Sequence, residues 1–368
     1  MEINFDRLQY ISGPSNVSLL EGKIGDVNKR ILLFGENHSH GNVCDDDYSV
    51  TITQFLTHLF RNTKKEIHFF LEILNKDIEY FKSFDRKYHM NDINELRYVF
   101  SNKKYNNIKF HYSDIRYFYG NRNIFNLLYD PGDKLLYIIN NDKFFNMNDI
   151  NSYYDDIRSY STIINLVVNG LKIDEKEYNK IKVEDTFIEF KKNLHKIFYK
   201  IDDDNIKKQI RSIIKITLVQ VQSKFEKFKK HINENEKIVK KNLFNRMTDI
   251  ETDKVVYEFI RDIRIFYKYI SIFIVLLTDL FTVRRILDKS YIENVITFNG
   301  SSHTTNLVNI LVNNFDFKII SDYSNVKYDI SKNYFNKFYD YSTNKYYEDD
   351  QINPIQCIDI SKFPKPLL

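Results

Sequence analysis

The sequence has 368 residues, a formal net charge of +4 at pH 7 and a hydrophobic content of 43%. This length allows one large domain or two ordinary ones, and the hydrophobic content allows a substantial buried core. A net charge this small does not require a nucleic acid or a membrane surface as partner, so the composition gives no clear sign of a nucleic-acid site.

The cysteines and the apolar runs indicate the cellular compartment in which the protein is expected. Cys44 and Cys357 are the only cysteines and lie far apart, which predicts neither a disulfide framework nor a zinc-finger spacing. A reducing compartment is then the simpler expectation, and the N-terminal residues show no signal peptide. The longest apolar stretch, residues 270–283, is shorter than a bilayer span and contains Asp279. We therefore expect a cytoplasmic protein that is not secreted, with a buried helix and no membrane span.

The first part of the chain alternates between strand and helix patterns. Short apolar runs occur at residues 30–35, 66–72 and 107–113, and amphipathic helical patterns occur at residues 50–62 and 91–102. Apolar residues spaced three and four apart indicate a helix with one buried face, whereas a short apolar run that ends at a glycine indicates a buried strand. This strand–helix–strand–helix–strand order predicts a parallel sheet with helices on its faces.

Helical patterns dominate the middle of the chain, and strand patterns return near its end. The helical patterns cover residues 150–170, 183–201, 205–232 and 253–288. Strand patterns follow at residues 294–299 and 317–321, and a helix is expected between them over residues 304–314, with Thr304 or Thr305 as its N-cap.

These patterns predict an α/β fold, in which a mostly parallel sheet with flanking helices is interrupted by a long all-helical insertion before the final strands. The expected divisions are residues 1–145 for the first part of the α/β domain, 146–290 for the insertion, 291–322 for the return to the sheet, and 323–368 for an irregular tail rich in Tyr, Asn and Lys. Residues 201–250 contain twelve Lys or Arg against seven Asp or Glu. This excess is typical of a solvated helical hairpin, and it leaves open a protein partner that binds the insertion or the tail.

Polar side chains follow four of the predicted strands, at the point where each strand ends. Gly35-Glu36-Asn37-His38 follows the first strand, Glu72 ends the second, Asp114 and Arg116 follow the third, and Gly300-Ser301-Ser302-His303 follows the late strand. The carboxyl ends of parallel strands meet at one edge of a sheet, where ligands bind in open α/β folds. The sequence therefore predicts a catalytic site formed by Glu36, His38, Glu72, Asp114, Arg116 and His303.

Two interpretations of this chemistry stay open. Glu36, His38, Glu72 and His303 carry the nitrogen and oxygen ligands that suit a divalent metal ion. The same residues can work without metal, with His38 as a general base and a neighbouring carboxylate fixing its tautomer. Arg116 cannot act as a base, and it would bind a carboxylate, a phosphate or a developing oxyanion.

Three further residues beside these motifs are secondary candidates. His40 follows His38 by two residues, so it is expected on the same side of the strand end as Glu36 and His38. It would be either a third ligand or a residue at the rim of the site. Ser301 and Ser302 precede a helix N-terminus, where free N–H groups favour anions.

Asp279 is a further candidate because an acid inside an apolar helix is costly unless it is paired. Arg284 and Arg285 lie five and six positions on, so neither is well placed to pair with it within the helix. We expect Asp279 to bond to another element, either as a structural pair or as part of the polar edge of the sheet. Arg285 is kept with it as a secondary site candidate.

The motif set resembles the superfamily that joins erythromycin esterases, the ChaN haem-binding lipoproteins, TraB and the Tiki proteases. The resemblance rests on the G-E-x-H at residues 35–38, on Glu72, on the D-x-R at residues 114–116 and on the G-x-x-H at residues 300–303. The stretches YISGPSNVSLLEGKI and FNGSSHTTN are similar to uncharacterised members encoded by large DNA viruses. The resemblance implies an α/β fold with its site at the strand ends and, for a viral protein, a location in the host cytoplasm or the virion.

One main hypothesis and two alternatives follow from these residues. The main hypothesis is a hydrolase that acts on an ester or peptide bond of a small-molecule or peptide substrate, with or without a divalent metal ion. The alternatives are a non-catalytic binding or virion-associated protein that retains the fold, and a haem- or metal-binding protein. Convergence of the strand ends into one polar site would favour the enzyme.

Overall fold

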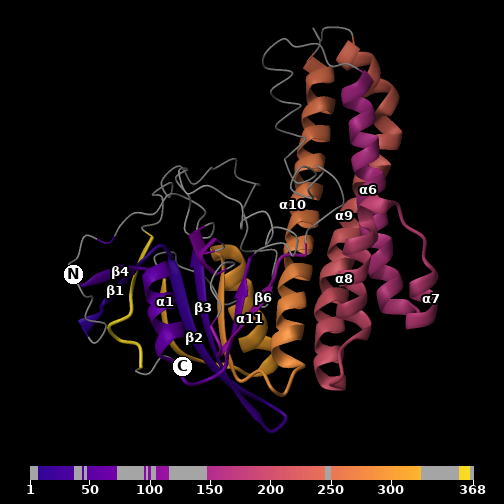
Figure 1. The fold of residues 1–368 in the computed structure, drawn as a ribbon. Helices are drawn as coiled ribbons and strands as arrows, with labels where there is room; N and C mark the ends of the chain where they lie inside the picture. Colours follow the sequence, from indigo (N-terminus) through magenta and orange to yellow (C-terminus); the bar gives the residue numbers. More distant parts are fainter. Residues whose placement is uncertain are drawn as a thin grey trace. The chain divides into compact units, whose positions relative to one another are not determined.

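The computed structural model describes residues 7–36, 44, 48–72, 95–96, 98–100, 105–115, 147–244, 250–324 and 356–364. The chain divides into two compact units (Figure 1). Residues 1–115 and 278–368 form the sheet unit, and residues 116–277 form the helical unit. The division falls within helix α10 (Ile250–Leu287), whose last turns belong to the sheet unit.

A six-stranded sheet lies at the centre of the sheet unit, in the strand order β6-β5-β7-β3-β2-β8. Its strands are β2 (Asn16–Ile24), β3 (Val27–Glu36), β5 (Ile67–Leu71), β6 (Ile108–Tyr112), β7 (Asn294–Gly300) and β8 (Lys318–Ser324). The neighbours β6, β5, β7 and β3 are parallel to one another. Their carboxyl ends therefore meet at one edge of the sheet.

The prediction of a mostly parallel sheet is wrong, because the sheets of this unit are mixed. β2 runs antiparallel to both β3 and β8, and it is joined to β3 by a two-residue turn at Gly25 and Asp26. Gly25 has a φ of 57°, which glycine adopts at little cost. The predicted first strand starts only at residue 30 and leaves out this hairpin, although a Gly-Asp turn between apolar strands is a hairpin signal.

Different helices cover the two faces of the large sheet (Figure 1). Alternate residues of a strand point to opposite faces, so Phe69 of β5 packs against Phe60 of α1 (Ile52–Asn62), whereas Phe70 lies beneath Arg285 of α10. Helix α11 (Ser301–Phe315) packs against β3 and β7. Its expected N-cap was Thr304 or Thr305, but the helix begins directly after Gly300. The late strand therefore delivers His303 within the first turn of α11.

A second, three-stranded sheet joins distant parts of the chain in the order β4-β1-β9. β1 (Tyr10–Ser12) pairs parallel with β4 (Ser49–Thr51) and antiparallel with β9 (Cys357–Asp359). The tail that was predicted to be irregular thus contains a strand. Two further backbone hydrogen bonds, each 2.8 Å long, extend its pairing with β1: the Ile360 N–H donates to the Gln9 carbonyl, and the Gly13 N–H donates to the Gln356 carbonyl.

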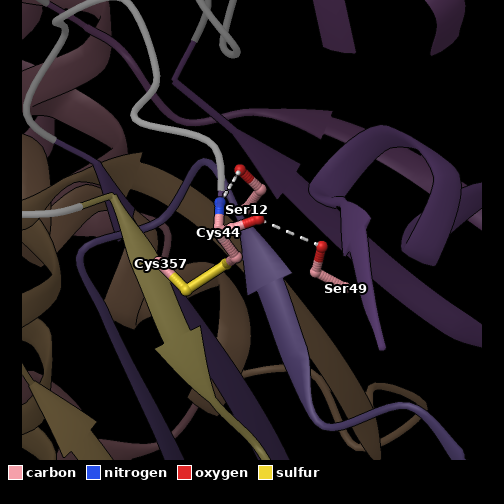
Figure 2. Close-up of a disulfide and its surroundings, with 4 residues drawn as sticks. All are labelled: Ser12, Cys44, Ser49 and Cys357. Carbon is pink, nitrogen blue, oxygen red and sulfur yellow. Dashed lines mark hydrogen bonds between the residues drawn. A yellow bond between two sulfur atoms is a disulfide. The ribbon is translucent and has the colours of Figure 1, made fainter. Parts of the chain in front are cut away.

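A disulfide joins Cys44 to Cys357 at this small sheet (Figure 2). The prediction that the two cysteines form no disulfide is wrong, and the cysteine count therefore gives no support to a reducing compartment. The Cys44 N–H donates to Ser12 Oγ and the Cys44 carbonyl accepts from Ser49 Oγ, each at 3.4 Å. The disulfide depends on the pairing of β9 with β1. Because 313 residues separate the two cysteines, their spacing in the sequence does not predict the bond.

The helical unit contains, within its described residues, α6 (Met147–Lys172), α7 (Glu175–Lys180), the 3-10 turn η2 (Asp185–Phe187), α8 (Ile188–Tyr199), α9 (Asp204–Phe244) and most of α10. Fully buried aromatic side chains such as Tyr160 and Phe198 form its core. The apolar stretch at residues 270–283 lies in α10 and is largely buried, as predicted. Among the helices of the described part of the chain, none is long and apolar enough to cross a membrane.

Candidate functional site

The carboxyl ends of the parallel strands bring three of the predicted motifs together. Glu36, the last residue of β3, lies opposite Gly300, the last residue of β7. Glu72 directly follows β5, and its N–H donates to the Phe298 carbonyl of β7 at 3.1 Å. Since Gly300 is also the N-cap of α11, the first turn of this helix stands at the same edge of the sheet.

His303 lies between two buried carboxylates at this edge. Its Nδ1 is 2.5 Å from Asp279 Oδ1, and its Nε2 is 3.5 Å from Glu72 Oε1. The exposed fractions of His303, Asp279 and Glu72 are 6%, 2% and 5%. We call these three residues the triad. Asp279 thus bonds to another element, as predicted, and that bond lies at the polar edge of the sheet.

The second oxygen of each carboxylate is also held. Glu72 Oε2 accepts from the Gly300 N–H at 2.7 Å, and Asp279 Oδ2 accepts from Asn306 Nδ2 at 2.9 Å. His303 and Asn306 are three residues apart in α11, so both point to the same side of the helix. These bonds fix the carboxylates on either side of the imidazole.

This geometry assigns a hydrogen to one ring nitrogen. An ionised carboxylate only accepts hydrogen bonds, so His303 Nδ1 carries the hydrogen directed at Asp279. His303 Nε2 is the other ring nitrogen, and it faces Glu72 Oε1. A proton transferred at Nε2 would leave the Nδ1 bond that orients the ring in place.

Serine hydroxyls join α11 to β3 beside the triad. Ser301 Oγ donates to the Glu36 carbonyl at 3.0 Å and lies 2.7 Å from Ser15 Oγ. Ser15 is fully buried, and its Oγ donates to the Gly35 carbonyl at 3.2 Å. The Ser301 hydroxyl therefore fastens the helix to the strand.

Gly35 permits this close approach. A Cβ at Gly35 would lie 2.0 Å from Asn16 Oδ1 and 2.9 Å from the Ser301 Cα, and the latter atom belongs to the backbone. We expect Gly35→Ala to lower the free energy of unfolding by about 2 kcal/mol, because the helix would have to move. Urea denaturation measures this change. Gly25→Asn is the control, since Asn tolerates a positive φ and a Cβ at Gly25 meets nothing within 4 Å. Equal losses in both variants would refute the steric argument.

The remaining predicted residues lie in different places. Asp114 is 7% exposed and follows β6 at the same edge of the sheet. Ser302 is exposed in the first turn of α11. His38, His40 and Arg116 lie outside the described residues.

No sequence pattern singles out Asn306, Asn299 or Ser113. Ser113 Oγ donates to Asn299 Oδ1 at 3.0 Å, which joins the ends of β6 and β7 at the site. The one available signal was the spacing of Asn306 from His303, three residues along one helix.

Arg285 belongs to a different series of hydrogen bonds, which contains none of the three triad residues. Arg285 Nη2 donates to His111 Nδ1 at 2.8 Å, His111 Nε2 is 2.8 Å from His68 Nδ1, and His68 Nε2 is 3.1 Å from Glu66 Oε1. The imidazole planes differ by 5° and the ring centroids are 5.1 Å apart. Nitrogens only 2.8 Å apart are too close for rings stacked face to face, so the rings lie edge to edge with an N–H pointing along their common plane.

The direction of this chain requires both histidines to be neutral. Because Arg285 only donates, His111 Nδ1 accepts, and the hydrogen on His111 Nε2 points to His68. Burial, followed by the Arg285 charge and by His68, lowers the pKa of His111 to about 3. Burial also lowers the pKa of His68, against the opposing effect of Glu66.

These pKa shifts predict acid sensitivity. In the unfolded chain both histidines bind a proton near pH 6.5, whereas the folded His111 binds one only near pH 3. Stability is therefore complete above about pH 6.5 and falls as the pH drops toward 3. We expect the free energy of unfolding to fall by ~1–2 kcal/mol between pH 7.5 and 5.0, after allowing for partial exposure. Urea denaturation at both pH values should show a smaller fall in His111→Gln and an unchanged fall in His58→Gln, a residue on α1. Identical falls in the wild type and His111→Gln would exclude His111 as the cause.

A metal centre formed only by the described residues is not supported. In that part of the chain, no group of three or more His, Cys, Asp or Glu side chains could hold a metal ion. In the described part of the site, one imidazole stands between two carboxylates.

Comparison with known proteins gives a family. Residues 78–368 match a family described as a family of unknown function, DUF5847. The chain belongs to this family. It is 28% identical to "Uncharacterized protein R161" of Acanthamoeba polyphaga mimivirus, over 96% of this chain and 97% of that protein. It is 27% identical to "Uncharacterized protein R706" of the same virus, over 84% of this chain and 86% of that protein. No solved structure matches the chain.

Membership of the DUF5847 family corrects the resemblance drawn from the motifs. The assignment to the superfamily of erythromycin esterases, ChaN, TraB and Tiki proteins is wrong, because the family match is to DUF5847 and not to that superfamily. The motifs behind it are only a few residues long. A glycine followed by polar residues at the end of a buried strand occurs in many α/β proteins, so it does not identify one family.

Proposed function

We propose that this protein is a hydrolase that cleaves an ester or peptide bond by acid–base catalysis at Asp279, His303 and Glu72. The observation that carries the proposal is the buried imidazole of His303, held between two carboxylates 2.5 Å and 3.5 Å away. The location at the carboxyl edge of parallel strands supports it, since this edge is where open α/β folds bind ligands.

In the proposed reaction, His303 Nε2 takes a proton from the attacking water. Asp279 keeps the Nδ1 hydrogen in place and stabilises the imidazolium that forms. Glu72, beside Nε2, accepts a hydrogen bond from the same water and orients it. His303 then returns the proton to the leaving oxygen or nitrogen when the bond to the carbonyl carbon breaks.

The energetic cost of the triad also supports a functional role. Two carboxylates and one imidazole in a nearly dry environment carry a large desolvation penalty, and buried ionic groups are weak contributors to stability. Buried titratable clusters in a cleft or at a ligand-binding edge are therefore candidates for catalysis. Hydrophobic residues of similar volume would stabilise the same place at lower cost.

The test is a screen of p-nitrophenyl esters and fluorogenic peptides with the wild-type protein and His303→Gln, purified in the same way. Hydrolysis by the wild type that His303→Gln lacks supports the proposal. A chelator arm with added Zn²⁺ or Mn²⁺ distinguishes metal-dependent from metal-free hydrolysis. Equal rates for both proteins on every substrate would overturn the proposal and favour a binding protein that retains the fold.

A further inference from the structure

Arg285 of α10 is a cationic residue of the sheet unit that the proposed reaction does not use. Its guanidinium carbon lies 5.9 Å from the centre of the Phe70 ring and 5.8 Å from the centre of the Tyr112 ring. Its Nη2 donates to His111 Nδ1 at 2.8 Å. We call Arg285, His111, Phe70 and Tyr112 the arginine site.

The guanidinium has no carboxylate partner in the part of the chain that the structure describes. The bond to His111 is the only hydrogen bond that the Arg285 side chain forms there, and no Asp or Glu forms an ion pair with it. A guanidinium has several N–H groups in a planar fork and accepts no hydrogen bond. The other N–H groups of Arg285 are therefore available to a ligand.

The hydrogen bond to His111 does not account for the charge of Arg285. His111 is neutral in this series of hydrogen bonds, so its Nδ1 offers a lone pair and no negative charge. The faces of Phe70 and Tyr112 attract a cation, but such contacts offset only part of the cost of taking a charge from water. A neutral amide such as Gln could donate to His111 without that cost. An anionic ligand would offset the cost and would give the charge a role.

A ligand can reach the arginine site because the site lies at the margin of the six-stranded sheet. β6, which carries His111 and Tyr112, is the first strand in the order β6-β5-β7-β3-β2-β8. Arg285, His111 and Tyr112 are half-buried, whereas Phe70 is fully buried. Contact with two rings and the bond to His111 fix the plane of the guanidinium. A fixed fork of N–H groups matches two oxygens of a carboxylate or a phosphate.

We propose that the arginine site binds a small organic anion, whose oxygens accept hydrogen bonds from the N–H groups of Arg285 that His111 leaves unused. The chemical class is a carboxylate or a phosphate monoester. A neutral ligand would leave the charge of Arg285 uncompensated, so the anionic oxygens are the part of the ligand that the site requires. The proposal does not rest on the proposed hydrolase, because binding at Arg285 needs neither His303 nor Asp279.

Titration calorimetry of the full chain tests the proposal with benzoate, phenyl phosphate and benzamide. Benzamide has the shape of benzoate without its charge. We expect benzoate or phenyl phosphate to bind at least about tenfold more tightly than benzamide, because hydrogen bonds between two charged groups are stronger than those to a neutral carbonyl. Which of the two anions binds more tightly identifies the preferred head group. Equal affinity for all three ligands, or binding of none, overturns the proposal.

Two variants and a control locate the site. Arg285→Gln keeps a donor for His111 but removes the charge, and it should weaken binding of the preferred anion at least about tenfold. Arg285→Lys keeps the charge and loses the planar fork, so its loss should be smaller than that of Arg285→Gln. Arg61→Gln removes an exposed charge from α1 and should leave the affinity unchanged. Equal losses in Arg285→Gln and Arg61→Gln would show attraction by general charge and contradict the assignment.

Histidine NMR gives a second measurement on the unsubstituted protein, which does not depend on the folding of a variant. With histidine labelled at its ring nitrogens, saturating benzoate or phenyl phosphate should shift the His111 Nδ1 resonance, because that nitrogen accepts from Arg285. The resonances of His58, which lies on α1, should not move. Binding without a shift at His111 would place the anion elsewhere and overturn the proposal.

Discussion

Replacing His303 with Gln is expected to lower the rate of ester or peptide hydrolysis by about 10³-fold, within the range that general acid–base groups contribute. The Gln amide can still donate to Asp279, so we expect the free energy of unfolding to change by no more than about 1–2 kcal/mol. The rate falls because an amide nitrogen cannot accept the proton that His303 Nε2 takes from water. Steady-state kinetics on the best substrate of the screen, together with urea denaturation, measures both quantities.

Asp279→Asn tests whether the triad acts as a unit. An Asn at this position can direct an amide at His303 Nδ1, which would favour the wrong tautomer of the ring. We expect a rate loss of about 10²- to 10⁴-fold, and the double variant with His303→Gln should be no slower than His303→Gln alone. His58→Gln, on the surface of α1, is the matched control and should keep full activity. Additive losses in the double variant would contradict a shared role.

The sequence predicts those parts of the fold that depend on local patterns. The helix at residues 50–62 and the strands at 66–72 and 107–113 appear within one or two residues of α1, β5 and β6. An amphipathic face or a short apolar run is a property of neighbouring residues, so its period can be read without knowing what it packs against. The reversed direction of β2 depends on a turn of two residues, which is a weaker signal than a repeated period.

The candidate site was predictable in part for the same reason. Glu36, Glu72 and His303 lie at strand ends, and parallel strands bring their carboxyl ends together wherever they stand in the chain. Asp279 was recognisable as an acid that needed a partner. Its partner, however, depends on how the end of α10 packs beside α11, and no spacing along the chain specifies that contact. The chain of Arg285, His111 and His68 depends on packing in the same way.

Removal of the disulfide between Cys44 and Cys357 is expected to lower the free energy of unfolding by ~4 kcal/mol. Cross-links that close long loops remove the most conformational entropy from the unfolded chain, and this one spans 313 residues. Urea denaturation of the double variant Cys44→Ser/Cys357→Ser measures the loss. Dithiothreitol should move the wild-type midpoint to that of the variant and leave the variant unchanged, which controls for the serine substitutions themselves.

Hydrogen exchange distinguishes a global loss of stability from local release of β9. β9 pairs with β1 and carries one end of the disulfide, so its three residues depend directly on the cross-link. If the disulfide acts through the unfolded chain, exchange should accelerate by a similar factor in β3, β7 and β9 of the double variant. If it serves mainly to hold β9 in place, exchange should rise in β1 and β9 alone while the urea midpoint changes little. The second result would contradict the expected loss, and it would mean that the large sheet and the triad fold without the C-terminal strand.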